Sequence, residues 1–505
     1  MTKIVSQQLS LRQSIPTISG CLEYTEFCDL LERIDGTIQV ADLDTPFISG
    51  YLERCAEEAR ACPEKGGALF KGFTYQEKIK LQEQALVAFR TCIARALTGE
   101  SFRDFHIRLA DSAVLQWFCR IDLVSHVRVP SKSSLERFEK YFSKECMDEA
   151  NARLLLSTTG KAHALKLELE SPLSLDDLFF DSTCVKTNIH YPVDWTLLRD
   201  AIRTLMKATG LIRKEGLKHR MEDPIIFIRS INKLSIQMSG ARRKNNAKRE
   251  RKRVLRLMKK LLNRVEGHAQ RHRDLLEKHR EKVSLSPGEV NQILFRIDGV
   301  MMEIPKILFQ AHERIIGERQ VANEKKLLSL YEKETRVIVR GKLGAEVEYG
   351  NTLLLVEQVD GLIVDWDFFK NGAPGDSKLF IPSLKRIKKK FKGQKINSAT
   401  TDRGFWSPEN ANYLREEKIA NHLCPRSVPE LKKKLEDPEF CVHQNRRSQT
   451  EGRVGIFKNN FLGRPLRSKG FEHRELKVGI CVLSHNLWVL GRIINEQIKQ
   501  KEKAA

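Results

Sequence analysis

The sequence lacks the usual marks of an exported or membrane-bound protein. No apolar run approaches the roughly 18 residues that span a membrane, and the first residues, MTKIVSQQLSLRQSIP, contain no apolar signal segment. The eleven cysteines include no C-x-x-C pair and no Cys/His group at zinc-ligand spacing. We therefore expect a cytoplasmic protein with reduced core thiols, without structural zinc and without a membrane partner.

Acidic residues are also scarce relative to basic ones. The chain has 65 Asp and Glu against 88 Lys and Arg, for a formal net charge of +23 and a pI of about 9.5. This excess favours a polyanionic partner, nucleic acid before membrane. A hydrophobic content of 41% excludes a disordered chain, and 505 residues are enough for about three domains.

Residues up to about 165 carry apolar side chains at the three- and four-residue spacing of helices, as in 81–97 and 102–121. Ser133 and Glu136 have the spacing of a capping box that begins a further helix. Short helices joined by polar turns suit a helix-turn-helix-like DNA-binding module. They suit a helical packing or dimerisation domain equally well. We expect residues 1–165 to form such a domain.

Between residues 163 and 189 the pattern becomes that of β-strands, in HALKLELE and LDDLFFDSTCVKTNI. Asp181 stands where we expect a buried strand to end, just before a Ser-Thr turn. Asp176 and Asp177 are competing candidates. An aspartate at a strand end is also commonly a turn or cap residue rather than a metal ligand.

A helical pattern returns after YPVDW and continues to about residue 334. Between residues 241 and 284 there are 17 Lys or Arg and five acidic residues, a net charge of +12. We expect residues 196–335 to form an inserted helical hairpin whose basic face contacts DNA phosphates. A coiled-coil arm with solvated charges is the alternative. The proposed contacts are Arg249, Arg251, Lys252 and Arg253, and the predicted heptad seam is Val254, Met258, Leu261, Val265, His268, His272, Leu275 and His279.

Strand patterns resume at residue 336 in VIVRGK, VEYGNTLLLVEQVDGLIVDWDFF and KINSATTDRGF, with a tight turn at Asp360-Gly361. Asp402 ends the last of these strands, before a glycine turn and a helix capped by Ser407. An amphipathic helix (377–391), a short strand near 419–423 and a helix near 429–435 complete this region, and a last apolar-faced helix covers 473–493.

Three lesser candidates accompany these strands. Trp406 is placed to stack on a base at a DNA end, with packing beneath the helix start as the alternative. Arg340 and Lys342 are candidates for phosphate contact, and a solvated strand edge explains them nearly as well.

A helix predicted to begin at Asp437-Pro438-Glu439 carries four polar residues on one stripe. They are Gln444, Arg447, Glu451 and Lys458, at intervals of three, four and seven. A carboxylate between cations suits a group that holds a metal ion beside a phosphate. Ordinary ion pairs on a solvated helix are the alternative.

Removing residues 195–335 joins the first strand to the later ones. The result is a mixed five-stranded sheet with helices, an α+β or mixed α/β fold of ribonuclease H-like layout, formed by residues 166–195 and 336–500. In that layout Asp181 and Asp402 lie on neighbouring strands, and Glu451 approaches from a helix on the sheet. Three carboxylates suit two Mg²⁺ ions, for which Mn²⁺ can substitute. Asp181 would bridge both ions, and Asp402 and Glu451 would each hold one.

Three stretches resemble motifs of the DDE transposases of bacterial insertion sequences. FFDSTCVKTNIHYPVDWTLLRDAIR is similar to the first-aspartate motif, and VRGKLGAEVEYGNTLLL with TTDRGFWSPEN to the second. One branch of the family has a signature helix with Tyr, Arg, Glu and Lys. Arg447, Glu451 and Lys458 match its spacing, but Gln444 occupies the tyrosine position. The likeness covers the catalytic segments, and more weakly the N-terminal third.

The resemblance implies a transposase of the bacterial cytoplasm and nucleoid that binds double-stranded DNA and has no small-molecule substrate. It implies metal-dependent cleavage of the element's inverted-repeat ends and joining of their 3′-OH groups to target DNA by a homodimer. Arg447 and Lys458 would neutralise phosphates beside Glu451. A nuclease of the same fold without strand transfer, or a catalytically silent DNA-binding relative, are the alternatives.

Overall fold

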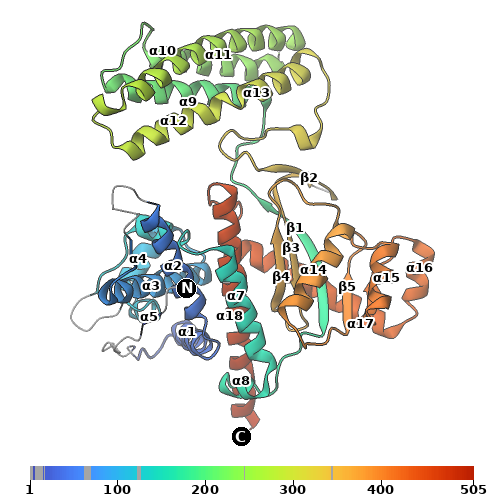
Figure 1. Ribbon diagram of the computed structural model, residues 1–505. Helices are drawn as coiled ribbons and strands as arrows, with labels where there is room; N and C mark the ends of the chain where they lie inside the picture. Colours follow the sequence, from blue (N-terminus) through green and yellow to red (C-terminus); the bar gives the residue numbers. More distant parts are fainter. Residues whose placement is uncertain are drawn as a thin grey trace. The chain divides into compact units, whose positions relative to one another are not determined.

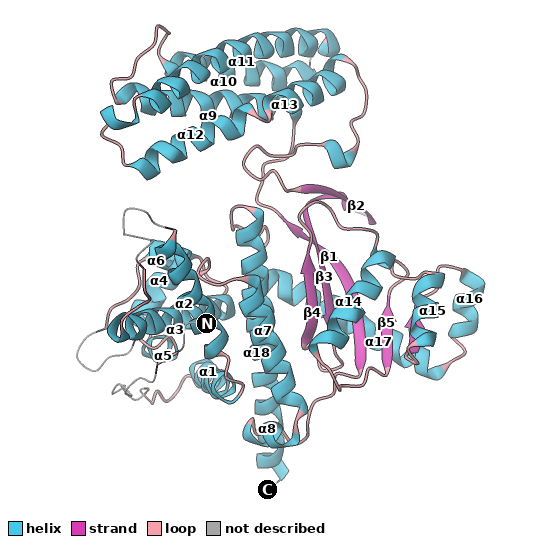
Figure 2. Ribbon diagram, viewed as in Figure 1, coloured by secondary structure: helices cyan, strands magenta, loops and turns pink. Residues whose placement is uncertain are grey.

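The computed structural model describes residues 4–5, 15, 17–61, 70–121, 127–243, 245–342 and 345–504, a few of them by the backbone alone. The chain divides into two compact units, Met1–Lys186 with Thr352–Ala505, and Thr187–Asn351 (Figure 1). The described residues form many helices and one mixed sheet (Figure 2). The α+β class is therefore confirmed. The sheet has six strands rather than the five expected.

The N-terminal part of the first unit is helical, as predicted. Buried apolar side chains of these helices continue into the core beneath the sheet, so the two parts share one hydrophobic cluster. The helices are α1 (Leu22–Val40), α2 (Asp44–Arg60), α3 (Tyr75–Thr98), α4 (Phe102–Asp111), α5 (Ala113–Phe118), α6 (Lys132–Phe138), α7 (Lys144–Thr159) and α8 (Lys161–Lys166).

Two local predictions in this part are wrong. The capping box at Ser133 does not form, because the upstream Ser131 already accepts the N–H of Ser134 and α6 begins at Lys132. The strand expected from HALKLELE is instead α8 and the turn after it. Ala164, Leu165 and Lys166 are strong helix formers, and over so short a run their propensity outweighs the alternating pattern.

The strands of the sheet are β1 (Asp177–Lys186), β2 (Arg336–Lys342), β3 (Ala345–Glu357), β4 (Ile363–Phe368), β5 (Ser398–Thr401) and β6 (Ala420–Leu423). Their hydrogen-bonded order is β2-β3-β1-β5-β6, and β4 also pairs with β3. β1, β5 and β6 run parallel, whereas β2 and β4 are antiparallel to β3. The predicted turn at Asp360-Gly361 joins β3 to β4, with Gly361 at a φ of +95° that suits glycine.

The helices that follow the strands are α14 (Asp376–Lys390), α15 (Pro408–Glu416), α16 (Val428–Lys434), α17 (Pro438–Ile456), the π-helix η7 (Phe457–Leu462) and α18 (Phe471–Ala504). The caps predicted for two of them are confirmed. Ser407 accepts the N–H of Asn410, and Asp437 accepts that of Glu439. α17 packs against β1, β5 and β6, and α14 packs against β4.

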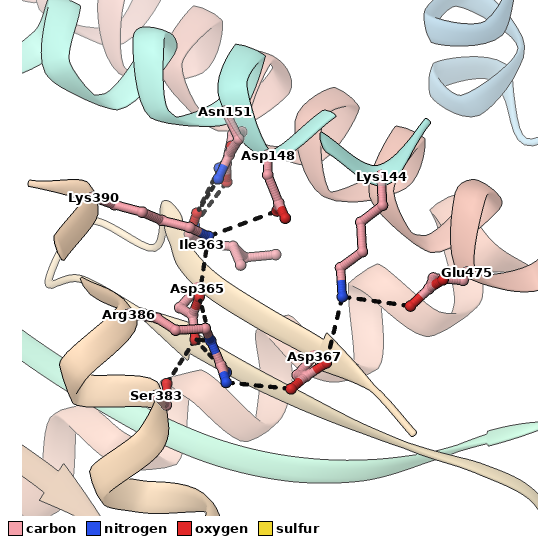
Figure 3. Close-up of polar contacts among 11 residues, drawn as sticks. Lys144, Asp148, Asn151, Ile363, Asp365, Asp367, Ser383, Arg386, Lys390 and Glu475 are labelled. Atoms are coloured by element: carbon pink, nitrogen blue, oxygen red, sulfur yellow. Dashed lines mark hydrogen bonds and ion pairs between the residues drawn. The ribbon is translucent and has the colours of Figure 1, made fainter. Parts of the chain in front are cut away.

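A buried polar network on β4 fastens α7 and α14 to the sheet (Figure 3). The fully buried carboxylate of Asp365 lies 2.7 Å from the Arg386 guanidinium and 3.2 Å from Lys390 Nζ, both on α14. Lys144 of α7 reaches Asp367 of β4 at 3.5 Å. A buried carboxylate is tolerated only with such partners. The network therefore fixes the N-terminal helices to the sheet.

α18 is long and apolar enough to pass a composition test for a membrane span over Phe471–Lys501. However, 78% of its most apolar 18-residue window is buried within the protein. Figure 1 shows it running alongside α7, with which it is in contact. This burial is the pattern of a core helix. The ten described cysteines are all free, and six of them are buried, as expected for core thiols.

In the described residues the second unit consists mainly of a bundle of five α-helices with short 3-10 and π-helical turns, and it also contains β2 and the first part of β3. The predicted two-helix hairpin is wrong, because apolar faces of α9 and α10 also pack against α11 and close a separate core. Ser286 caps α12 in a capping box with Glu289, so the predicted break is confirmed. The helices are α9 (Asp194–Lys214), α10 (Pro224–Gly240), α11 (Ala247–Lys278), α12 (Pro287–Met301) and α13 (Ile304–Ala311), and the turns are η3 (Ala241–Arg243), η4 (Arg280–Lys282), η5 (His312–Ile316) and η6 (Asn323–Lys325).

The heptad seam predicted for α11 holds only in part. The predicted residues Val254, Met258, Val265 and His272 are buried. At three other places the buried residue is one position later than predicted: Leu262 instead of Leu261, Ala269 instead of His268, and Leu276 instead of Leu275. A helix in a bundle keeps 3.6 residues per turn and drifts from a strict seven-residue repeat. The buried stripe accordingly moves around the helix.

Candidate active site

The register of two parallel strands sets the positions of the predicted aspartates. β1 pairs with β5 from Asp177 opposite Ser398 to Phe180 opposite Thr401. The next residues are Asp181 and Asp402, so the two carboxylates follow the last paired positions at the same level of the sheet. Asp181 does not end its strand as predicted, because β1 continues through the buried Cys184 and Val185.

The backbone after β5 aims the Asp402 side chain. Its Oδ1 accepts the N–H of Gly404 at 2.8 Å, which holds the carboxylate in the turn before α15. A Cβ on Gly404 would lie 2.7 Å from Asp376 Oδ2 and 3.1 Å from Asp402 Oδ1. A side chain at position 404 would therefore displace the Asp376 carboxylate or disturb the hydrogen bond that aims Asp402.

Electrostatics link the three carboxylates. Burial, followed by the charges of Asp402 and Glu451, raises the pKa of Asp181 to about 7. Hydrogen bonding from the Ser182 backbone and the charge of Arg447 oppose that rise. A half-buried carboxylate that shares its surroundings with two others is suited to a cation, because a positive ion would favour its charged form.

Gln444 ties α17 to the ends of two strands. Its Nε2 donates to the carbonyl oxygens of His422 (2.8 Å) and Thr401 (3.2 Å), the last residue before Asp402. Its Oε1 accepts from Arg447 Nε at 3.3 Å, and Arg447 lies 3.1 Å from Glu451 Oε1. The side chain at the expected tyrosine position therefore positions the helix that carries Glu451.

A buried clamp holds the other side of α17. Glu357, at the end of β3, is 4% exposed and accepts from Thr450 Oγ1 at 2.6 Å and from Arg446 Nη1 at 3.0 Å. Arg453 Nη1 lies 3.4 Å from the same carboxylate. These contacts flank Glu451, whose own side chain is 61% exposed. The helix is thus anchored while the predicted ligand faces solvent.

The Lys458 side chain is buried. It belongs to η7, is 6% exposed, and donates to Thr183 Oγ1 at 2.8 Å. Thr183 lies two residues beyond Asp181 on β1, so both side chains share one face of the strand. The lysine therefore places buried positive charge on the strand face that carries Asp181 rather than on the outer surface.

The spacing of the carboxylates bears on the ion they suit. Among the described residues, His422, Glu439 and His443 form one group of three possible metal ligands. One ligand atom from each lies within 4.8 Å of the other two. Asp181, Asp402 and Glu451 do not form such a group among the described residues. Their oxygen-only donor set fits Mg²⁺, which keeps several waters and needs few protein ligands.

Comparison with protein-family models, curated proteins and solved structures finds no match for this chain. The assignment of the site therefore depends on the motifs and the geometry above.

The remaining predicted residues are scattered. Trp406 is half-buried and packs against the core of the first unit, which favours the packing alternative. The side chains of Arg340 and Lys342 lie outside the described residues. On α11, Arg253 pairs with Glu250 at 2.8 Å and Lys252 with Glu318 at 2.9 Å. Among described residues, Arg249 and Arg251 have no hydrogen-bond or ion-pair partner.

Two features escaped the sequence interpretation. One is the His422 group, of which Glu439 and His443 have the four-residue helical spacing that could have signalled it. The other is a hollow of about 690 Å³ along α4, α6 and residues 459–469. Its lining includes five exposed cations without ion pairs among the described residues: Arg103, Lys132, Arg464, Arg467 and Lys469.

Proposed function

We propose that this chain is a DDE-type DNA transposase with a ribonuclease H-like catalytic domain. The observation that carries the proposal is the β1–β5 register, which sets Asp181 level with Asp402, together with the helix that carries Glu451 packed on the same strands. The order of strands and helices in the sequence predicted this arrangement of three carboxylates. In the proposed reaction the enzyme cleaves the ends of its element and joins their 3′-OH groups to target DNA.

The site residues have distinct tasks in this proposal. Two Mg²⁺ ions, or Mn²⁺ in their place, would supply activation of the attacking oxygen and charge stabilisation at the leaving oxygen of a phosphodiester. Asp181, Asp402 and Glu451 would hold the ions. Arg447 neutralises a neighbouring phosphate, with its position set by Gln444 and Glu451. Lys458 contributes positive charge from its buried position beside Thr183.

Two basic surfaces support binding to double-stranded DNA. The hollow lined by Arg464, Arg467 and Lys469 adjoins η7, the segment that directly follows the Glu451 helix. The second surface is α11, where Arg249 and Arg251 are available for phosphates. Exposed cations without partners gain more from a phosphate contact than paired ones, because they have no ion pair to give up. Cleavage in the bacterial nucleoid by a homodimer on paired ends remains part of the proposal.

A nuclease of the same fold is the competing function, and strand transfer distinguishes the two. The substrate is a pre-cut duplex that ends in the terminal sequence flanking this coding region, mixed with a supercoiled target plasmid and Mg²⁺. We expect covalent joining of the 3′-OH end to the plasmid. Hydrolysis of the plasmid without joined product would assign the chain to the nucleases. Binding without either reaction would indicate a silent relative.

A further inference from the structure

A second group of potential metal ligands lies on the sheet near the carboxylates but uses different residues. His422 is on β6, and Glu439 and His443 are in the first turns of α17. One ligand atom from each lies within 4.8 Å of the others. The imidazole rings of His422 and His443 stack with centroids 4.1 Å apart and planes 9° apart.

His422 is left with unused polar atoms. Its side chain is in the core, with 4% exposure, and neither ring nitrogen has a hydrogen-bond partner among the described residues. Glu439 Oε1 lies 3.5 Å from its Nε2. Buried polar groups are nearly always paired, so an imidazole with two orphan nitrogens points to a missing partner.

We propose that His422, Glu439 and His443 bind a transition-metal ion of the Zn²⁺ class, at a site separate from the three catalytic carboxylates. Two imidazoles and one carboxylate form a donor set that zinc uses in proteins, whereas Mg²⁺ prefers oxygen alone. The two sites would therefore select different metals from the same solution.

Binding of one ion requires the two imidazoles to rotate out of their stacked arrangement, because each ring binds a metal in its own plane and the two planes are now 9° apart. Two nitrogens bound to a tetrahedral zinc at 2.0–2.1 Å are about 3.4 Å apart, compared with ligand atoms that now lie within 4.8 Å. The Glu439 side chain is 67% exposed and free to rotate toward the ion. Thr400 Oγ1 lies 3.4 Å from His443 Nδ1, which leaves Nε2 of that ring for the metal. Solvent can supply a fourth ligand on the exposed side.

The ion would join β6 to the beginning of α17. Gln444, next to His443, already binds the carbonyl oxygens of His422 and Thr401. Glu451 lies eight residues beyond His443 on the same helix. Zinc at this position would therefore stiffen the attachment of the helix that carries Glu451. This effect does not depend on whether the protein joins DNA strands.

The test uses the full chain after chelation and gel filtration, titrated with Zn²⁺ by calorimetry and with Co²⁺ by visible absorption. We expect one ion per wild-type chain, tetrahedral Co²⁺ bands, and a Tm raised by zinc. Glu439→Gln and His443→Ala should weaken Zn²⁺ binding at least tenfold and abolish the Co²⁺ bands. Glu439 is exposed, so its variant tests the site even if the histidine variant folds poorly.

The controls separate this site from others. Glu436→Gln and His163→Ala replace exposed residues of the same types elsewhere, and they should bind Zn²⁺ like the wild type. Asp402→Asn should also retain zinc binding. The proposal is overturned if wild-type affinity equals that of Glu439→Gln, or if Asp402→Asn abolishes zinc binding as completely as His443→Ala.

Discussion

The side-chain amide of Gln444 donates a hydrogen bond to the carbonyl oxygen of Thr401 at 3.2 Å. This contact joins the helix of Glu451 to β5, which ends directly before Asp402. The same amide reaches His422, and its oxygen holds Arg447. Gln444 thus connects the elements that supply two of the three proposed ligands.

Replacing Gln444 with alanine should loosen that connection. Loss of two hydrogen bonds to buried carbonyl oxygens should cost about 1–3 kcal/mol in the free energy of unfolding, and amide exchange should accelerate in the first half of α17. Gln449→Ala is the matched control, since Gln449 is exposed on the same helix. Gln444→Tyr should not restore stability, because one hydroxyl cannot donate to both carbonyls. Equal stability of the two alanine variants would contradict the positioning role.

The raised pKa of Asp181 predicts a pH-dependent cost of folding. Its pKa is about 7 in the folded chain, compared with about 3.9 when unfolded. A carboxyl group with a raised folded pKa favours folding at pH below about 4, and this contribution is lost as the pH rises to 7. Without divalent metal, Asp181→Asn should therefore gain stability relative to wild type between pH 4 and 7, by about 3 kcal/mol.

The check is urea denaturation of both proteins across that pH range, with chelator and then with Mg²⁺. We expect Mg²⁺ at pH 8 to stabilise the wild type, so that its free energy of unfolding comes closer to that of Asp181→Asn. If the difference in free energy of unfolding between the two proteins stays constant from pH 4 to 8, Asp181 does not titrate near pH 7.

The Glu357 clamp should contribute strongly to stability. Glu357→Gln leaves the half-buried guanidinium groups of Arg446 and Arg453 without their carboxylate, and we expect a loss of about 2–4 kcal/mol. Glu496→Gln breaks the exposed Arg492 pair on α18 and should cost less than about 1 kcal/mol. Thermal and chemical denaturation of the two variants provides the comparison. Similar losses would mean that Glu357 is not an anchor of α17.

The salt dependence of DNA binding should distinguish free from paired cations on α11. Arg249→Ala with Arg251→Ala should reduce the slope of log K against log salt by up to about two, roughly 0.9 per lost phosphate contact. Lys252→Ala with Arg253→Ala should reduce it less, because these side chains already pair with Glu318 and Glu250. The slope comes from fluorescence anisotropy with a duplex oligonucleotide. Unchanged slopes in both variants would mean that α11 does not touch DNA.

The cations of the hollow allow a parallel comparison within the first unit. Arg464→Ala with Arg467→Ala should weaken duplex binding severalfold at low salt. Lys161→Ala with Lys166→Ala removes the same charge from exposed positions on α8 and should have a smaller effect. Equal effects would indicate that net charge alone, rather than the hollow, governs binding.

Local chemistry explains most of what could be predicted from the sequence. The helix starts at Ser407 and Asp437 depend on cap residues that bind N–H groups two or three positions away. The turn at Gly361 depends on one backbone angle. Asp402 was predictable because a strand, a glycine turn and a capped helix follow one another directly.

Features that depend on distant partners were not predictable. Lys458 appears on the helical stripe of Glu451, but the π-helical turn at η7 carries it into contact with Thr183. His422 stacks on His443 only because β6 and α17 pack together. The five-helix bundle likewise arises from apolar faces far apart in sequence.

Mg²⁺-dependent cleavage of a supercoiled plasmid that carries the flanking DNA of the gene tests the central claim most directly. We expect wild-type protein to nick it at the element ends, and Asp181→Asn, Asp402→Asn and Glu451→Gln each to lose at least about a hundredfold in rate, a cost of about 2.7 kcal/mol. Asp176→Asn, next to the strand but outside the site, should retain activity. Undiminished cleavage by any of the three site variants would contradict the assignment of Asp181, Asp402 and Glu451 as the catalytic centre.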